Sequence, residues 1–199
     1  DTGYWDTWDG APGTDTDAPI VDDQSLSPTK SFEVAGTTDL IFLMGDRKSG
    51  KYQLDFNMYV PSTNVGYYNI QHFETPGTEW AYDVFFSAGT DEGNGWIFAC
   101  NDSIPFSFTH DTWHKFTNIF DMNNDVAEVY IDDVLVDTWK FSCQSTNEVG
   151  TNQLGAVDFW AGGPEDGPPL YYVDDLEFIE LVPALEEPIL DLTVDDPIF

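Results

Sequence analysis

Six side chains of types that recognise sugars occur within stretches of alternating polar and apolar residues. They are Asn69, Gln71, Asp83, Trp96, Asp158 and Trp160. Amides and carboxylates exchange hydrogen bonds with hydroxyl groups, and the face of an indole ring packs against the C–H groups of a sugar. On one exposed face of a sheet, these side chains would form a carbohydrate-binding surface, with the two tryptophans at its rims beside glycine-containing turns.

The alternation within each stretch predicts which side chains point outward, because successive side chains of a β-strand face opposite sides. Four apolar neighbours of the polar residues are suited to a core: Ile70, Val84, Val157 and Phe159. The neighbouring side chains should then point outward: Asn69, Gln71, Asp83, Asp158 and Trp160. For Trp160, a place in the core is an equally good alternative. Three other tryptophans are expected in the core: Trp80, Trp113 and Trp139.

Acidic residues outnumber basic ones by 37 to 6, which gives a formal net charge of −31. Such a surface repels phosphate backbones and anionic lipid headgroups, so the charge argues against nucleic-acid and membrane-surface partners. The chain also lacks an apolar run of membrane-spanning length. The carboxylates either form a hydrated surface screened by salt or include some that gather around Ca²⁺, which prefers oxygen ligands. We expect one or two calcium positions among many solvated carboxylates.

Cys100 and Cys143 are the only cysteines of the chain. A single pair, without a Cys-x-x-Cys motif or clustered histidines, favours one disulfide in an oxidising compartment over a zinc site. The alternative is two buried free thiols. We therefore expect a secreted or cell-surface protein, and a chain that begins at Asp1 agrees with a removed leader or with excision from a longer protein.

Period-two alternation recurs along the middle of the chain, whereas convincing helical periodicity is lacking. In the stretch 53–60, for example, Leu54, Phe56 and Met58 alternate with polar residues and Pro61 ends the pattern. About twelve strands separated by turns predict a two-sheet antiparallel β-sandwich of the jelly-roll type. The expected strands are 31–34, 39–43, 53–60, 66–73, 79–87, 95–101, 103–108, 112–122, 126–131, 134–141, 154–160 and 171–181.

The two ends of the chain differ in composition from the middle. Residues 1–30 are rich in Asp, Thr, Gly and Pro but include Trp5 and Trp8, so we expect this irregular segment to pack on the sandwich. Residues 183–199 combine prolines with acidic residues and resemble an interdomain linker or tail. We therefore expect a module over 1–182, followed by a linker to neighbouring domains of a parent protein.

Three groups of residues resemble sandwich modules of known families. The opening pieces are Trp5-Asp6-Thr7-Trp8, Asp17-Ala18-Pro19 and Ser31-Phe32-Glu33-Val34; the closing strand is Tyr171-Tyr172-Val173-Asp174-Asp175-Leu176-Glu177-Phe178; the central hairpin combines Trp113 and Phe120-Asp121 with Ala127-Glu128-Val129-Tyr130-Ile131-Asp132. The opening and closing pieces resemble jelly-roll modules of the carbohydrate-binding type, and the hairpin resembles concanavalin-like (laminin-G-like) sandwiches. Their order, across about residues 1–181, resembles modules of secreted surface proteins of polysaccharide-degrading marine bacteria of the Bacteroidetes type.

This resemblance implies a non-catalytic carbohydrate-binding module whose partner is a polysaccharide or cell-surface glycan. In such jelly rolls a structural Ca²⁺ commonly joins the opening segment to the last strand, which implies Asp174 as a ligand with Asp17 or Asp15 as its partner. The alternative role is a protein-binding or adhesion module that presents the parent protein at the cell surface, because the fold itself does not choose between these ligands.

Catalysis is the third possibility, and the motifs argue against it. Concanavalin-like glycoside hydrolases carry Glu-x-Asp-x-x-Glu on one strand, whose alternation places three carboxylates in one cleft. In this chain, 79–83 lacks that spacing and 177–180 lacks the aspartate. The histidines are not spaced for a metal triad, and no serine or cysteine motif completes a catalytic triad with them. They are His72, His110 and His114.

Overall fold

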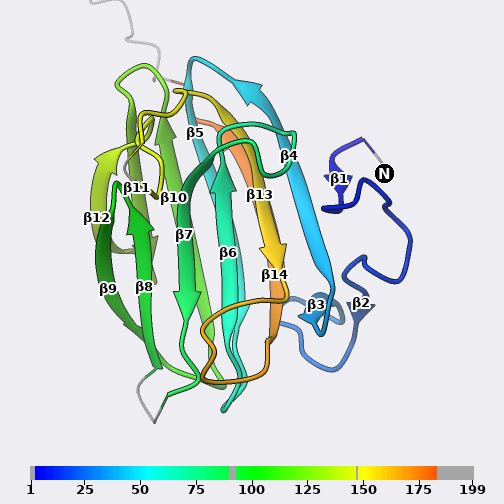
Figure 1. Cartoon of the computed structure of the whole chain (residues 1–199). Coiled ribbons are helices and arrows are strands. Elements are labelled where there is room, and N and C mark those ends of the chain that lie inside the picture. The colour runs from blue at the N-terminus through cyan, green and yellow to red at the C-terminus, as the bar shows by residue number, and fades with distance from the viewer. Residues whose placement is uncertain (1–2, 90–92, 147, 183–199) are drawn as a thin grey trace, which may run out of the picture.

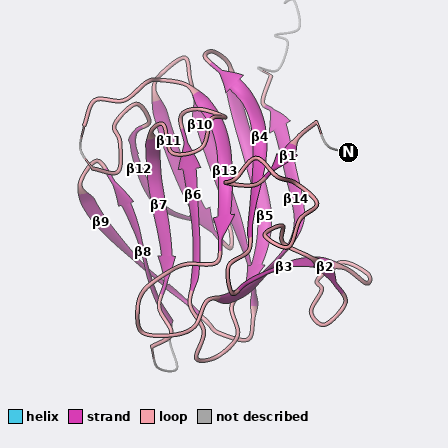
Figure 2. Cartoon of the chain, turned by 45° about the vertical axis from the view of Figure 1, so that its right-hand side comes forward, coloured by secondary structure: helices cyan, strands magenta, loops and turns pink. Residues whose placement is uncertain are grey.

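The computed structural model describes residues 3–89, 93–146 and 148–182, and these residues form two antiparallel sheets of seven strands each. The sheets pack face to face as a sandwich (Figure 1 and Figure 2). The first sheet has the strand order β1-β4-β13-β6-β7-β8-β9, and the second has the order β12-β11-β10-β5-β14-β3-β2. The predicted all-β sandwich is confirmed.

All twelve strands expected from the sequence are present, and two more come from the opening segment. The strands of the first sheet are β1 (Trp5–Asp6), β4 (Asp39–Arg47), β13 (Leu154–Trp160), β6 (Gly66–Gln71), β7 (Trp80–Phe86), β8 (Gly93–Ala99) and β9 (Asp102–Phe108). Those of the second are β12 (Val134–Lys140), β11 (Val126–Ile131), β10 (Trp113–Asp121), β5 (Lys51–Tyr59), β14 (Leu170–Glu180), β3 (Ser31–Ala35) and β2 (Ile20–Val21). The additional strands β1 and β2 have two residues each, which is too short for an alternating pattern.

The core between the sheets is rich in aromatic rings. Phe56 of β5 meets Phe159 of β13 edge to face, with ring centroids 5.1 Å apart, and it meets Tyr68 of β6 in the same way. Full burial of a large apolar side chain stabilises a fold by about 1.5–3 kcal/mol. The four residues expected to point into the core are fully buried there, which confirms the register of β6, β7 and β13: Ile70, Val84, Val157 and Phe159.

Two of the three tryptophans expected in the core lie outside it. Only Trp139 packs against the core cluster. Trp113 lies beside Tyr59, its register partner, on the outer face of the second sheet, because it shares the phase of Lys115 and not that of buried Phe116. Trp80 begins β7 and is half-buried against Trp8 of the opening segment. Size and hydrophobicity alone did not identify their positions.

The opening segment lies on one side of the sandwich (Figure 2). β1 pairs with β4, and β2 pairs with β3. The indole of Trp5 contacts Phe42 and Phe32 at the edge of the core. The segment is therefore held on both sheets, and it delivers Trp8 to the face of the first sheet.

A disulfide joins Cys100 to Cys143, with 5.2 Å between their Cα atoms. Cys100 follows β8 of the first sheet and Cys143 follows β12 of the second, so the bond connects the two sheets near their edges. Because the residues are 43 apart in sequence, closing this loop contributes about 4 kcal/mol on the chain-entropy account. The segment 183–199, expected to be a linker, lies outside the described residues. No membrane-spanning helix occurs among the residues that are described.

Candidate functional site

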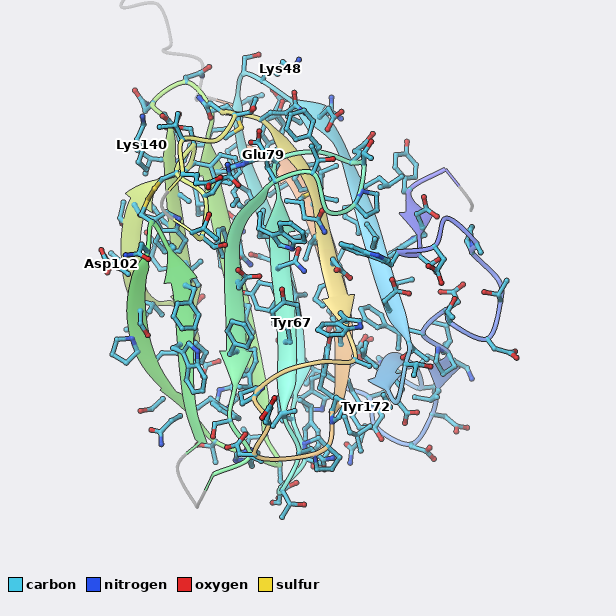
Figure 3. All side chains as sticks on the ribbon, in the orientation of Figure 1. Lys48, Tyr67, Glu79, Asp102, Lys140 and Tyr172 are labelled. Carbon is cyan, nitrogen blue, oxygen red and sulfur yellow. A yellow bond between two sulfur atoms is a disulfide. The ribbon has the colours of Figure 1, made fainter. Side chains whose placement is uncertain are left out.

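A pocket of about 350 Å³ opens on the outer face of the first sheet. Four aromatic side chains form its walls, and an amide and a carboxylate form its floor. The six lining residues are Trp8, Tyr67, Asn69, Trp80, Asp158 and Trp160. They come from the opening segment and from three adjacent strands, β13, β6 and β7. Figure 3 shows Tyr67 over the middle of this sheet.

Strand register places the polar floor. Asp158 of β13 lies opposite Asn69 of β6, which in turn lies opposite Asp83 of β7. Side chains of residues paired in this way share a face of the sheet, so the three form a row across the strands. The amide of Asn69 donates a hydrogen bond to Asp158 Oδ2 (3.1 Å), and the hydroxyl of Tyr67 donates to Asp83 Oδ1 (2.5 Å).

This row faces outward, as the alternation predicts, yet the floor side chains are not exposed. Asn69 is 1% exposed and Asp158 is 3% exposed. The aromatic residues that surround the row cover it, and these come partly from segments remote in sequence. Alternation predicts the face of a side chain, whereas the chain that crosses above the sheet determines how much of it water reaches.

One wall consists of two tryptophans that stack on each other. The rings of Trp8 and Trp80 lie 6.2 Å apart with an angle of 26° between their planes. The backbone N–H of Trp8 donates to Asp39 Oδ2 (2.5 Å), which anchors the opening segment to β4. Gly77 makes room for this wall, since a Cβ atom there would lie 2.9 Å from Trp8 Cη2. Its φ of +72° also favours glycine.

The opposite wall is Trp160, at the end of β13, which is 49% exposed. Its ring meets that of Tyr67 edge to face at 5.8 Å. The ring also lies over Gly162, where a Cβ atom would approach Trp160 Cε3 to 2.3 Å. Each of the two walls thus packs closely on a loop glycine, Trp8 on Gly77 of the β6–β7 loop and Trp160 on Gly162 after β13.

The electrostatics of the pocket are those of buried carboxylates. Burial raises the pKa of Asp158 to about 7; the hydrogen bond from Asn69 lowers it, and the nearby charges of Asp39 and Asp83 raise it further. Burial likewise raises the pKa of Asp39 and of Asp83. None of the ion pairs found within 3–89, 93–146 and 148–182 includes any of these three aspartates.

Three of the six residues expected to bind sugar line this pocket: Asn69, Asp158 and Trp160. Asp83 lies behind it, as the acceptor for Tyr67. Gln71 is fully buried, and its Oε1 accepts a hydrogen bond from the N–H of Gly77. Trp96 is not at the rim of the pocket. It lies on β8, two strands away from β6, and stacks there on Phe85 of β7.

Sequence reasoning did not place Trp8, Tyr67 or Trp80 in the site. The pair of tryptophans in an otherwise polar opening segment signals that the segment packs on the sandwich, but the signal does not indicate where. For Tyr67 a signal was available: the alternation puts Tyr67 on the same outward face as Asn69, and this could have identified it as a residue of the site.

Of the three aspartates expected to bind calcium, two accept hydrogen bonds from the protein and one is exposed. Asp174 accepts hydrogen bonds from the N–H groups of Leu26 and Ser27 and from the Ser27 hydroxyl. Asp17 accepts from the N–H of Gly13, and Asp15 is exposed. Among the described residues, no three His, Cys, Asp or Glu side chains gather as a metal site. Calcium binding stays a prediction, and direct hydrogen bonds already join the opening segment to the last strand.

Comparison with known proteins identifies the fold of this chain but does not assign the chain to a family. No protein-family model matches the sequence, and no curated protein matches it. The chain superposes on a variant of alginate lyase A1-II′ with a TM-score of 0.59 and 8% identity, covering 89% of this chain and 95% of the other. The carbohydrate recognition domain of Emp47p gives 0.51 at 10% identity, with 92% and 97% covered.

The carbohydrate-binding module CBM66 from Bacillus subtilis also gives 0.51 at 10% identity, with 87% of this chain and 94% of the module covered. Of two longer neighbours, a sialidase and a botulinum neurotoxin binding domain, the chain spans only 16% and 48%. At such low identities the likeness establishes the fold alone. The chain has the jelly-roll sandwich fold that these carbohydrate-binding modules and alginate lyases share.

Proposed function

We propose that this chain is a non-catalytic carbohydrate-binding module whose ligand occupies the pocket between Trp8, Trp80 and Trp160. The observation that carries the proposal is a floor of buried polar groups enclosed by aromatic walls. Pockets of this make-up bind small ligands by apolar contact and use a few polar groups to fix their orientation. A volume of about 350 Å³ suits one or two sugar rings of a longer chain.

The physical basis is that a pyranose has two kinds of surface. Its C–H faces are apolar and pack on indole rings, while its hydroxyls need partners when they leave water. The aromatic walls supply the apolar packing surface, and Asn69 and Asp158 on the floor supply hydrogen-bond partners for the hydroxyls. Solved neighbours of this fold include a carbohydrate recognition domain and a carbohydrate-binding module, which supports the proposal.

Catalysis is the less favoured function, although enzymes share the fold. Glycoside hydrolysis requires two carboxyl groups on either side of the scissile bond, and the lining of this pocket contains one, Asp158. Elimination from a uronic acid would require a positive group to neutralise the sugar carboxylate in the transition state. The pocket lining includes neither lysine nor arginine nor histidine. These two features favour binding without reaction.

The setting of the module follows from the same proposal. The Cys100–Cys143 disulfide suits an oxidising compartment, so we place the module in a secreted or cell-surface protein, where polysaccharides are found. Calcium stabilisation, implied by the family resemblance, remains part of the proposal. The competing function is adhesion to a protein, which a flat apolar patch would favour. A concave pocket with aromatic walls and a polar floor favours a glycan.

Titration calorimetry with a panel of neutral, cationic and acidic oligosaccharides tests the proposal. At least one glycan should bind, and Trp160→Ala should weaken it about tenfold, because a stacked ring contributes on the order of 1 kcal/mol beyond its area. Trp113→Ala is the matched control, since that half-buried tryptophan lies on the other sheet. If no glycan binds the folded module, or if both variants bind equally well, the pocket is not a sugar site and adhesion becomes the better explanation.

A further inference from the structure

Buried carboxyl groups lie at and around the floor of the pocket, and no lysine, arginine or histidine is among the described residues that line it. Three aspartates approach it from three strands: Asp158 from the floor itself, Asp39 beside Trp160 in the β4–β13 register, and Asp83 behind Tyr67. Asp39 and Asp158 are both nearly inaccessible to water. A buried carboxylate without a compensating charge is costly. Such a group is retained where a ligand supplies the missing charge.

The floor also contains acceptors that lack a donor. Asp158 Oδ1 and Asn69 Oδ1 are both buried and find no hydrogen-bond partner among the described residues. The amide nitrogen of Asn69 already serves Asp158 Oδ2. A ligand group that satisfies both oxygens must therefore donate two hydrogen bonds.

The walls select the same kind of ligand. Three indoles and a phenol surround the floor, and the negative face of an aromatic ring attracts a cation within about 6 Å of its centre, most strongly for tryptophan. We propose that the pocket binds a primary ammonium group carried on a sugar, that is, an amino sugar whose nitrogen is not acetylated, with Asp158 as its counter-ion. This inference rests on the proposed function and names the substrate class of the same site.

Other cations and other sugars fit less well. A quaternary ammonium would satisfy the aromatic walls, but it has no N–H to donate to Asp158 Oδ1 and Asn69 Oδ1. An N-acetylated sugar would offer one N–H and no charge. A uronic acid would add a carboxylate to three that are already close together. A primary ammonium has a positive charge and three donors, which matches both deficits of the floor.

The test compares three probes at fixed pH and at physiological salt: glucosamine oligomers, N-acetylglucosamine oligomers of the same length, and choline. Salt is held high because a chain with a net charge of −31 attracts any polycation non-specifically. Each probe is titrated into the natural protein, into Asp158→Asn, and into Asp102→Asn. Asp102 is exposed at the edge of the sheet, far from Tyr67 in Figure 3, and its variant removes the same charge.

The glucosamine oligomer should bind at least about tenfold more tightly than its acetylated counterpart and than choline. Asp158→Asn should remove that preference, and Asp102→Asn should leave it intact. Equal loss in both aspartate variants would show non-specific attraction and overturn the inference. Binding of the acetylated oligomer as tightly as the amine would also overturn it, while the proposed function would stand. If choline binds best, the site recognises a quaternary ammonium, and failure of every probe and every neutral glycan would instead remove the proposed function.

Discussion

The charged groups on the two outer faces of the sandwich differ in their burial and in their partners. On the first sheet, Asp39 and Asp158 are almost inaccessible to water and Asp83 is half-buried, and no lysine or arginine is among the described residues that line the pocket beside them. On the second sheet, a groove of about 430 Å³ is lined by two of the six basic residues of the chain, Lys51 and Lys115, among acidic and polar neighbours.

The second face balances its charges within the protein. Lys115 Nζ lies 3.6 Å from Asp55 and 3.4 Å from Asp133, and the hydroxyl of Tyr130 donates to Glu128 (2.6 Å). One oxygen of Asp55 has no partner, but the other accepts from Gln53 and faces Lys115, so its charge is compensated. This face has the character of an ordinary solvated surface.

The difference distinguishes a surface from a site. Both faces are hollowed, and the second hollow is the larger one, so shape alone does not identify the binding face. What marks the first face is that its polar groups are buried without their electrostatic complement. Perturbed, unpaired groups of this kind concentrate at functional sites because function, rather than stability, explains their retention.

The largest expected effect comes from removing one carboxylate on the first face. Asp158→Asn should stabilise the free protein at pH 8 by up to about 4 kcal/mol, the cost that corresponds to a pKa raised from 3.8 to about 7. A raised carboxyl pKa means that the folded state binds the proton more tightly than the unfolded chain does. The penalty is therefore absent below about pH 4, grows between pH 4 and 7, and is constant above pH 7.

Urea unfolding of both proteins at pH 4 and pH 8 measures this difference. Asp55→Asn on the second face is the matched control, and it should lower stability by about 0–1 kcal/mol because it breaks an ion pair whose lysine is 41% exposed and screened by solvent. A loss of stability in Asp158→Asn at pH 8 would contradict the comparison, since it would make that carboxylate a structural group like Asp55.

The next effect concerns how the opening segment is held to the last strand, β14 of the second sheet. Asp174→Ala should destabilise the protein by about 2 kcal/mol in EDTA, because three donors of Leu26 and Ser27 lose their charged acceptor. Glu177→Ala, at an exposed position of the same strand, is the control. Calcium should add a stabilisation to the natural protein that Asp174→Ala lacks. Equal melting temperatures in calcium and EDTA would overturn the calcium prediction.

Alternation explains why so much of the fold could be predicted. Strand β5 shows the strict period of two that places Leu54, Phe56 and Met58 in the core, and the other long strands follow the same rule. The face of the site was predictable for the same reason. Its walls were not, because Trp8 reaches the pocket through a segment without periodicity, whose N–H at Trp8 is fixed by the side chain of Asp39. Contacts between segments remote in sequence leave no periodic signal.

A smaller effect, on glycan affinity, should come from moving the ring of Trp160 without removing it. Gly162→Ala retains every aromatic residue but forces the ring of Trp160 to move, because the new Cβ atom would lie 2.3 Å from it. Glycan affinity should fall severalfold, while thermal stability stays nearly unchanged because that ring is half exposed. In Gly89→Ala the new Cβ atom would meet, among the described residues, the Ser87 hydroxyl alone, at 3.2 Å, and affinity should not change. Unchanged affinity in both variants would mean that Trp160 is not a wall of the working site.

The smallest expected effect lies on the second face. Lys115→Met removes the positive partner of Asp55 and Asp133 but keeps most of the side-chain length, and the lysine is 41% exposed. Solvent and salt screen such a pair, so the loss should be at most about 1 kcal/mol at low salt and should fade as ionic strength rises. The neighbouring carboxylates, Asp55 first, raise the pKa of Lys115. This small stabilisation is therefore present at neutral pH and disappears only above the ordinary lysine range.

Glycan affinity should not change in Lys115→Met, because this face is separate from the pocket on the other sheet. Urea unfolding at low and high salt, together with one titration, measures both quantities. A loss of several kcal/mol that persists at high salt would mean that the lysine compensates a desolvated charge, and the contrast between the two faces would then disappear.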